Sequence, residues 1–275
     1  MEELTAKATK MEPNQHPLTL TFLGTGTSQG VPLIGCDCAI CRSIDPRDSR
    51  LRTSAMVEVG NARFIIDAGP DFRQQMLRER ISHISALLLT HKHKDHTGGI
   101  DDVRALNFVD YPQAIHTVHI YGSQDSCSCV RKDYDYAFSP NPYRGVPQIE
   151  LHEFGSEPFV VDGVEIIPIR GEHSRFEVTG FRFDRLAYLT DFKRISDEEC
   201  AKLQGVEVLV VNALRFEPHD SHFSVEEALE LIAKVAPKEA YLTHISHDLG
   251  LHTVAQMRLP EGVFLAYDGL KLKLQ

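Results

Sequence analysis

Most of the fold follows from one stretch, Thr90-His91-Lys92-His93-Lys94-Asp95-His96-Thr97-Gly98-Gly99, which comes directly after the apolar run Ala86–Leu89. The stretch offers four candidate metal ligands: His91, His93, Asp95 and His96. Imidazole nitrogen and carboxylate oxygen suit zinc, manganese or iron. In an extended segment the first three side chains point the same way, and His96 joins them only where the chain turns. A solvated polar loop is the alternative, but so many ligands after a buried strand favour a metal site.

Three further candidates come after other apolar runs. His173 follows Val164–Ile169, Asp191 follows Leu186–Leu189, and His244 follows Ala240–Leu242. Singly, each is more typical of a capping or surface residue. Together, at successive strand ends, they are expected to gather at one edge of a layered protein.

The composition describes an ordinary globular chain of 275 residues, with 42% hydrophobic and 25% charged residues. No apolar run approaches the roughly 18 residues that cross a bilayer. Residues 1–17 are polar without a signal core, so we expect a flexible tail followed by a single domain over 18–275 in a cytoplasmic protein. Its six cysteines would then stay reduced. The formal net charge of -10 disfavours binding of extended nucleic acid.

The apolar patterns predict an α/β (α+β) protein built as a layered sandwich of strands with helices outside. A hairpin is expected around Gly60-Asn61, and Ser224 with Glu227 has the spacing of a capping box that opens a helix to about Val235. Ser139–Pro147, with three prolines, is expected to protrude. The expected strands are Leu18–Leu23, Ser54–Val59, Arg63–Asp67, Ala86–Leu89, His116–Tyr121, Ile149–Phe154, Phe159–Val161, Val164–Ile169, Val178–Phe183, Leu186–Leu189, Val206–Val211, Ala240–Leu242 and, last, Val263–Tyr267; Asp71–Arg80 is an expected helix.

A second candidate metal site is rich in cysteine. Cys36, Cys38 and Cys41 lie within six residues, which in a reducing compartment indicates metal binding rather than a disulfide. A closed zinc site needs a fourth ligand, and His247 is our choice. The alternative is three free thiols in an irregular loop. We interpret Cys127, Cys129 and Cys200 as ordinary reduced cysteines.

The histidine-aspartate pattern, with Asp67 upstream, resembles the metallo-β-lactamase superfamily from about Leu18 to the C-terminus. The resemblance implies a four-layer αββα sandwich with two metal ions, zinc or manganese and possibly iron, at one edge. It implies that His91, His93 and His173 hold one ion, that Asp95, His96 and His244 hold the other, and that Asp191 bridges them. Asp67 would orient the ligand loop from behind.

The implied chemistry is hydrolysis. Two divalent ions lower the pKa of a shared water, so that a bridging hydroxide is available as the nucleophile. Two dications, two ligating aspartates and one hydroxide leave about one positive charge, which suits an anionic phosphodiester.

Further motifs narrow the resemblance. Gly24-Thr25-Gly26, Gln29-Gly30-Val31-Pro32 and the cysteine loop, together with the His244/His247 pair, are similar to the phosphoribosyl cyclic phosphodiesterases of phosphonate breakdown, which also carry a structural zinc. This implies a small cyclic phosphate or nucleotide-like diester as substrate, and makes a homodimer plausible. It also implies a catalytic histidine in residues 219–224, for which we choose His222 as proton donor and keep His219 as the alternative.

Two other functions remain open. A tRNA 3′-end endonuclease shares these ligands, but no basic, glycine-rich arm is present: Ser139–Pro147 contains a single basic residue, Arg144. A metal-binding module without turnover is the other alternative. The sequence does not rank Arg52, Arg73, Arg104 and Arg170 as phosphate contacts, and it does not identify the metal.

Overall fold

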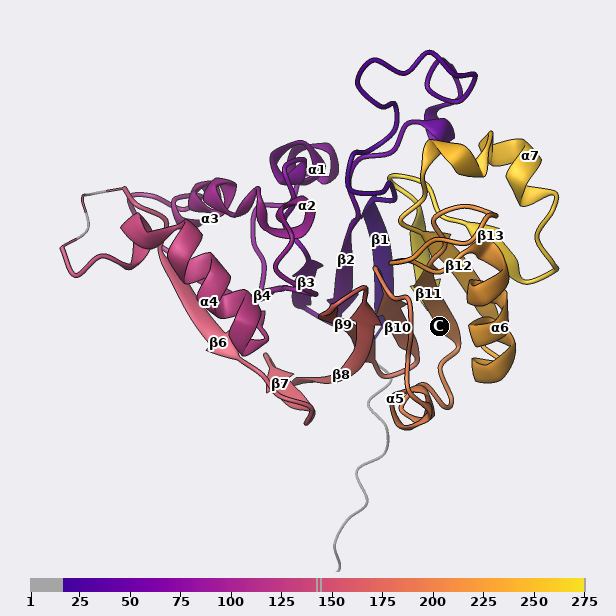
Figure 1. The fold of residues 1–275 in the computed structure, drawn as a ribbon. Helices are drawn as coiled ribbons and strands as arrows, with labels where there is room; N and C mark the ends of the chain where they lie inside the picture. The colour runs from indigo at the N-terminus through magenta and orange to yellow at the C-terminus, as the bar shows by residue number, and fades with distance from the viewer. Residues whose placement is uncertain (1–16, 142, 144, 275) are drawn as a thin grey trace, which may run out of the picture.

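The structure is a computed structural model that describes residues 17–141, 143 and 145–274. The predicted tail lies outside this part of the chain except for Pro17, and so does Arg144. Two seven-stranded sheets face each other, with strand orders β14-β1-β2-β3-β4-β5-β6 and β13-β12-β11-β10-β9-β8-β7 (Figure 1). The strands are β1 (Leu18–Gly24), β2 (Ser54–Val59), β3 (Ala62–Ile66), β4 (Ala86–Leu88), β5 (Val118–Gly122), β6 (Ile149–Glu153), β7 (Phe159–Val161), β8 (Val164–His173), β9 (Phe176–Phe183), β10 (Leu186–Leu189), β11 (Val208–Asn212), β12 (Glu239–Thr243), β13 (Val263–Leu265) and β14 (Lys271–Leu274).

Helices cover the outer face of each sheet. Within the described residues, no helix is both long and apolar enough to cross a membrane. The α-helices are α1 (Phe72–Glu79), α2 (Lys94–Thr97), α3 (Arg104–Asn107), α4 (Gln124–Asp133), α5 (Asp197–Ala201), α6 (Val225–Val235) and α7 (His252–Gln256), and the 3-10 helices are η1 (Pro46–Asp48), η2 (Ile100–Val103), η3 (Asp135–Phe138) and η4 (His247–Leu249).

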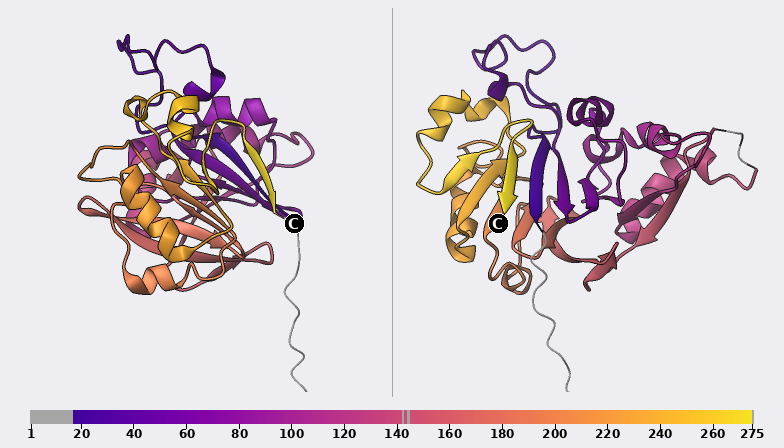
Figure 2. Two further views of the ribbon diagram at one scale, coloured as in Figure 1. Left: turned by 90° about the vertical axis from the view of Figure 1, so that its right-hand side faces the viewer. Right: turned by 180° about the vertical axis from the view of Figure 1, so that it is seen from behind.

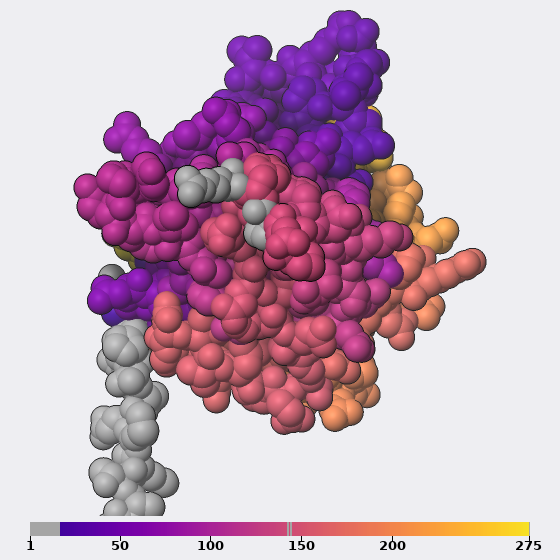
Figure 3. All heavy atoms as spheres, turned by 90° about the vertical axis from the view of Figure 1, so that its left-hand side faces the viewer, coloured from indigo at the N-terminus to yellow at the C-terminus, as the bar shows by residue number. Residues whose placement is uncertain are grey.

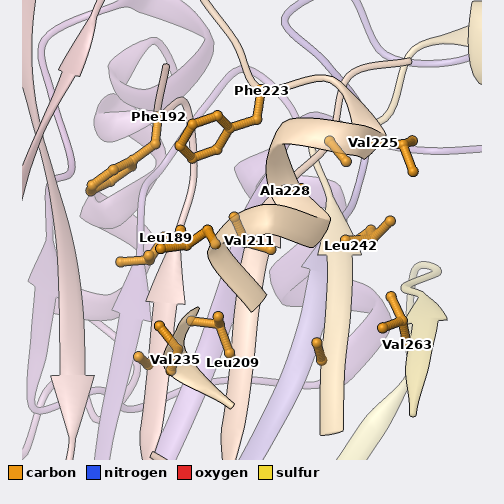
Figure 4. Close-up of a cluster of buried hydrophobic side chains, with 14 of the residues drawn as sticks. Leu189, Phe192, Leu209, Val211, Phe223, Val225, Ala228, Val235, Leu242 and Val263 are labelled. Atoms are coloured by element: carbon orange, nitrogen blue, oxygen red, sulfur yellow. The ribbon is translucent and has the colours of Figure 1, made fainter. Parts of the chain in front are cut away.

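Three buried apolar clusters separate the layers. The middle cluster takes residues from both sheets, among them Phe22, Phe64 and Phe181. The second packs α1, η2 and α4 against the first sheet, and the third packs α5, α6 and α7 against the second sheet. In Figure 4, α6 lays Val225 and Ala228 over Leu209, Val211 and Leu242 of β11 and β12. The predicted four-layer αββα sandwich is confirmed.

The predicted capping box at Ser224 is also observed. The Ser224 side chain accepts a hydrogen bond from the Glu227 amide, and the Glu227 carboxylate accepts one from the Ser224 amide at 2.8 Å. The hairpin of β2 and β3 is likewise present, with Val59 paired to Ala62.

Several elements differ from prediction, among them the last strand and helix α4. Val263–Tyr267 is not the last strand, because β14 follows it and pairs antiparallel with β1, beside which it lies in Figure 2 (yellow against indigo). The alternation in Lys271-Leu272-Lys273-Leu274 is too short to stand out in the sequence. Helix α4 was not expected because its polar sequence buries little besides Cys127 and Val130, and Ser123 caps its first turn.

The strand directions bring distant residues to one edge of the sandwich. β3 and β4 are parallel, as are β10, β11 and β12, so the residues that follow these strands emerge on a common side within each sheet. The amide of Thr179 in β9 donates to the Thr90 carbonyl at 2.9 Å and ties the two sheets together there.

Candidate metal centre

The His91–His96 loop is extended only at its start. The chain turns at Lys94, where α2 begins. The His93 carbonyl accepts hydrogen bonds from the amides of His96 and Thr97, each at 3.0 Å. Asp95 and His96 therefore project from a helical turn, which corrects the expectation that Asp95 shares an extended face with His91.

Glycines let this turn pack closely on the chain that follows β3. A Cβ atom at Gly69 would lie 1.9 Å from the Asp95 carbonyl oxygen, and one at Gly99 would lie 2.0 Å from that of Gly69. Both contacts are far below any tolerated distance, so only glycine fits at these two positions.

The first ligand group consists of three histidines. The ligand atoms of His91, His93 and His173 all lie within 4.8 Å of one another. His91 Nε2 is 3.0 Å from His93 Nδ1, and the ring of His173 lies 5.3 and 5.1 Å from the rings of His91 and His93. His173 is oriented by a hydrogen bond from its Nδ1 to the Ser221 carbonyl at 2.8 Å.

The second ligand group surrounds Asp191. Its Oδ2 lies 3.3 Å from His96 Nε2 and 3.2 Å from His244 Nδ1, and Asp95 Oδ2 lies 3.1 Å from His96 Nε2. His91 with His96 and Asp191 is a further set of three ligand atoms within 4.8 Å. The two groups are therefore adjacent, and Asp191 lies where a bridging ligand is expected. The structure brings all seven predicted residues together, while their roles as ligands stay predictions.

Asp67 lies behind the ligands, fully buried. Its Oδ2 is 2.6 Å from His96 Nδ1 and accepts a hydrogen bond from the Thr90 hydroxyl at 2.8 Å. The Thr90 amide donates to Oδ1 at 2.9 Å. An acceptor at Nδ1 fixes the ring tautomer and leaves the Nε2 lone pair of His96 free for a cation.

Strained backbone marks the same edge. Asp67, Asp191 and His244 follow the ends of β3, β10 and β12, and each has a positive φ, of 63°, 64° and 56°. Non-glycine residues rarely adopt this conformation, and asparagine, aspartate and histidine are the most frequent exceptions. Such residues cluster at functional sites, where the surrounding structure holds them in place.

The site attracts positive charge. Burial raises the pKa of Asp191, but the charges of His244 and His96 outweigh it and hold that pKa well below its usual range. Burial lowers the pKa of His96, yet Asp191, Asp67 and Asp95 together raise it well above normal. Burial and the charge on His96 lower the pKa of His91, which therefore stays neutral. Ionised carboxylates and the neutral imidazole of His91 are donors for divalent cations, and a cation bound at His96 would take the place of its proton.

A second observation also indicates that the described residues fit metal ions. The Nε2 atoms of His96 and His244 are buried and make no hydrogen bond within the described part of the chain. A buried polar atom without a partner is costly, and a metal–nitrogen bond would satisfy each of these atoms.

The two candidate catalytic histidines lie at one side of this cluster. His222 is buried, its ring lies 4.7 Å from that of His244, and its Nδ1 is 3.7 Å from Asp191 Oδ1. Burial, followed by the charge of His244, lowers its pKa to about 3. His219 is more exposed, lies 5.3 Å from the His222 ring and contacts the Ser221 hydroxyl at 3.1 Å.

The cysteine loop closes on His247. The Nδ1 atom lies 3.5, 3.4 and 3.6 Å from the sulfurs of Cys36, Cys38 and Cys41. A tetrahedral zinc with the usual bond lengths separates sulfur and nitrogen ligands by about 3.6 Å. All three distances fit that geometry, and the four ligand atoms form one compact group. The backbone amide of Cys41, with His247, lowers the pKa of Cys38 to about 6 and so favours the thiolate.

A cavity of about 400 Å³ borders His91. It is lined by Lys92, Arg170, Phe176 and the first turn of α4, among others. Of the four arginines that the sequence left unranked, Arg170 is the one that lines this cavity, whereas Arg52 is paired with Asp71 at 3.1 Å.

Several parts of the site are not apparent from the sequence. Thr90 stands in the quoted stretch but received no role, although its hydroxyl contacts Asp67 and, at 3.0 Å, His91 Nδ1. Phe176 is half-exposed with its ring 5.2 Å from that of His93, and no sequence signal distinguishes it from an ordinary strand residue. Ser221 orients His173 through its backbone carbonyl, which no sequence pattern reveals.

Comparison with known proteins agrees with this geometry. The family model described as Beta-lactamase superfamily domain matches residues 62–245. The chain therefore belongs to the β-lactamase superfamily, and its fold is that of the metal-dependent hydrolases of the metallo-β-lactamase type.

Individual relatives differ in how much they share. A solved diphosphatase of the PhnP family is 41% identical, with a TM-score of 0.87 over 94% of this chain and 97% of the other. Octanoyltransferase from Porphyromonas gingivalis is 38% identical over 253 residues, which are 91% of this chain and 50% of that protein. The chain thus spans half of that relative's length. Zinc-bound PqqB from Methylobacterium extorquens, 19% identical with a TM-score of 0.74 over 93% of this chain and 100% of the other, shares the fold.

Proposed function

We propose that this chain is a dimetal-dependent phosphodiesterase that acts on a small cyclic phosphate or a nucleotide-like diester. The observation that carries the proposal is the convergence of two ligand groups on Asp191, whose ligand atom lies within 4.8 Å of those of His91 in the first group and His96 in the second. The similarity to a diphosphatase of the PhnP family supports phosphate chemistry.

Divalent ions held by these residues, of zinc, manganese or iron, would supply Lewis acidity and a water of lowered pKa. The residues of the chain would determine the net charge of the site, the contacts to the substrate and the proton donor. Asp95 and Asp191 bring two negative charges, fewer than two divalent cations carry, so the site would retain a positive charge that suits an anionic phosphate. Arg170 and Lys92, at the cavity beside His91, would meet the rest of the substrate, which at Lys92 would compete with the ion pair to Asp125 at 2.8 Å. A ring N–H of His222 would donate to the leaving oxygen.

A second candidate reaction is cleavage of a diphosphate linkage, because the 41% identical relative is named a diphosphatase. In both reactions water attacks a phosphorus atom and displaces an oxygen leaving group, and both would use the same residues. Human tRNase Z, with 16% identity and a TM-score of 0.65, shows likeness of fold alone. The net charge of -10 continues to disfavour a long polyanion as substrate, and a homodimer stays a prediction.

Hydrolysis of bis(p-nitrophenyl) phosphate, a cyclic ribose phosphate and a nucleotide diphosphate, with Mn²⁺ or Zn²⁺ and after chelation, tests the proposal. We expect metal-dependent turnover of a diester and its loss in Asp191→Ala, which should also lose bound metal because the residue contacts both groups. Full activity in Asp191→Ala would show that Asp191 does not bridge the two metal ions. Metal binding without turnover of any phosphate substrate would favour the non-catalytic module.

A further inference from the structure

A third group of possible metal ligands lies on the outer strands of the first sheet. β5 and β6 are parallel neighbours, with His119 opposite Glu150 and Tyr121 opposite His152. Side chains opposite one another lie on the same face of a sheet, and so do residues two apart on one strand. His119, Glu150 and His152 therefore share one face of the sheet. Their strands belong to the magenta and pink part of the chain, which forms much of the surface seen in Figure 3.

The three side chains approach closely. His119 Nδ1 lies 2.9 Å from His152 Nε2, and each of these atoms lies 3.7 Å from a Glu150 oxygen. The His152 ring is stacked on Tyr121 with 4.5 Å between ring centres, and Tyr121 is stacked on Phe159 at 5.5 Å. The group is thus carried by regular strands and braced by aromatic rings, which fixes its geometry better than a loop would.

Hydrogen bonds within this group do not satisfy all of its polar atoms. The facing nitrogens of two neutral imidazoles share at most one proton, and 3.7 Å is beyond hydrogen-bonding distance for Glu150. The exposed cluster of His83, Asp110 and His116 differs, because Asp110 Oδ2 accepts from both rings, at 3.0 and 2.7 Å. That second cluster is satisfied without an ion.

The distances match those of metal ligands. Two nitrogens bound tetrahedrally at the usual zinc–nitrogen length lie about 3.3 Å apart, between the 2.9 and 3.7 Å observed here. His91 Nε2 and His93 Nδ1, in the dimetal cluster, approach in the same way at 3.0 Å. Two histidines and one carboxylate are a set that borderline divalent ions prefer.

We propose that His119, Glu150 and His152 form a separate binding site for a borderline divalent cation such as Zn²⁺ or Cu²⁺. None of its residues belongs to the dimetal group or to the cysteine group. With side chains 42%, 58% and 29% exposed, the site is open to solvent, keeps coordination positions for water and exchanges its ion. The bound ion clamps β5 to β6, the edge strand of the sheet.

The charge around the group favours a cation. Glu150 supplies a negative charge 3.7 Å from each of the two facing imidazole nitrogens. One carboxylate against a divalent ion leaves a single positive charge, which the exposed surface and water can solvate.

The test is zinc stoichiometry of the full-length protein, measured by equilibrium dialysis over a range of free Zn²⁺ with elemental analysis. His119→Gln and His152→Gln are compared with His83→Gln and His116→Gln, matched controls from the satisfied cluster. We expect the wild type and both controls to bind about one Zn²⁺ per chain more than the two test variants. The melting temperature of the wild type should rise as this last site fills, and that rise should be absent in the test variants.

His152→Gln also removes the stacking on Tyr121, so circular dichroism must show a folded variant. His119→Gln, at the more exposed histidine, repeats the test without that contact. Identical zinc isotherms for the wild type and a folded His119→Gln would overturn the proposal. Loss of the ion in His83→Gln or His116→Gln would do so too, since the ion would then lie at the control cluster.

Discussion

Single residues at the edge of the sandwich where the candidate metal ligands gather are held in costly conformations. Contacts with neighbouring residues offset that cost. Asp67 combines a φ of 63° with complete burial, and hydrogen bonds from Thr90 with the contact to His96 satisfy its carboxylate. Asp67→Asn keeps the size but puts a neutral amide beside His96 Nδ1, so the ring loses its anionic partner. Groups that orient metal ligands typically contribute about 10- to 100-fold to metal affinity or activity. We expect such a loss of metal affinity, measured by competition with a chromogenic chelator; unchanged affinity would mean that Asp67 has only a structural role.

His222 and His219 can be distinguished by the leaving group. A proton donor matters most when the departing oxygen is strongly basic, and such catalysis contributes about 10²- to 10⁴-fold. We expect His222→Gln to reduce kcat in this range for an alkyl phosphodiester and to affect a p-nitrophenyl ester far less. His219→Gln serves as the control. The His219 ring is more exposed, and its centre lies 5.3 Å from that of the His222 ring. The reverse ranking of the two variants would transfer the role to His219.

At the scale of elements, the cysteine loop connects chain segments that the sheets do not. Ile245 is held between Thr25 and Thr27, by its amide to the Thr25 carbonyl at 2.9 Å and by its carbonyl to the Thr27 amide at 3.1 Å. His244 lies on one side of Ile245 and His247 on the other, so a zinc at the cysteine group would fasten the same short segment that presents His244. In Figure 1 this N-terminal loop (indigo) projects beside α7 (yellow).

Cys38→Ser should therefore lower zinc content and stability while leaving part of the hydrolytic activity. We expect a fall in Tm of about 4–8 °C, the shift that a loss of about 2 kcal/mol produces in a chain of this size. Elemental analysis and calorimetry measure the two effects. Cys129→Ser is the matched control, since Cys129 lies in α4, away from His247. If both variants retain the same zinc, the cysteines do not bind it.

At the scale of the whole molecule, the sequence predicts the layers and the gathering of the candidate ligands, because both depend on patterns that are visible in the amino-acid sequence itself. Apolar runs that end in histidine or aspartate mark strands and their common edge. The sequence does not reveal α4, whose few apolar residues leave no helical stripe, or β14, whose Leu274 becomes significant only when paired with Leu18. Nor does it reveal the helical turn at Lys94, which depends on the close contact of Gly69 with Asp95.

The stability of the whole molecule should depend on one histidine outside the metal groups. His252 is 5% exposed, its Nδ1 lies 3.1 Å from Arg50 Nη2, and its amide donates to Asp48 at 2.7 Å. Burial, followed by the charges of Arg50 and Arg47, lowers its pKa to about 4. Above pH 6.5 the ring is neutral in both the folded and the unfolded chain, so it adds no pH dependence. As the pH falls from about 6.5 to about 4, only the unfolded chain takes up the proton, and the free energy of unfolding decreases.

His252→Gln removes this proton uptake and keeps an acceptor within reach of Arg50. We expect the variant to lose stability less steeply on acidification between these two pH values, by up to about 1.4 kcal/mol per pH unit, the value for one proton. Urea unfolding of both proteins at a fixed concentration of free zinc isolates the effect, because protonation of the metal ligands is common to both. Parallel pH profiles would show that His252 is protonated as easily in the folded chain as in the unfolded one, and that its contact with the Arg50 guanidinium does not persist in solution.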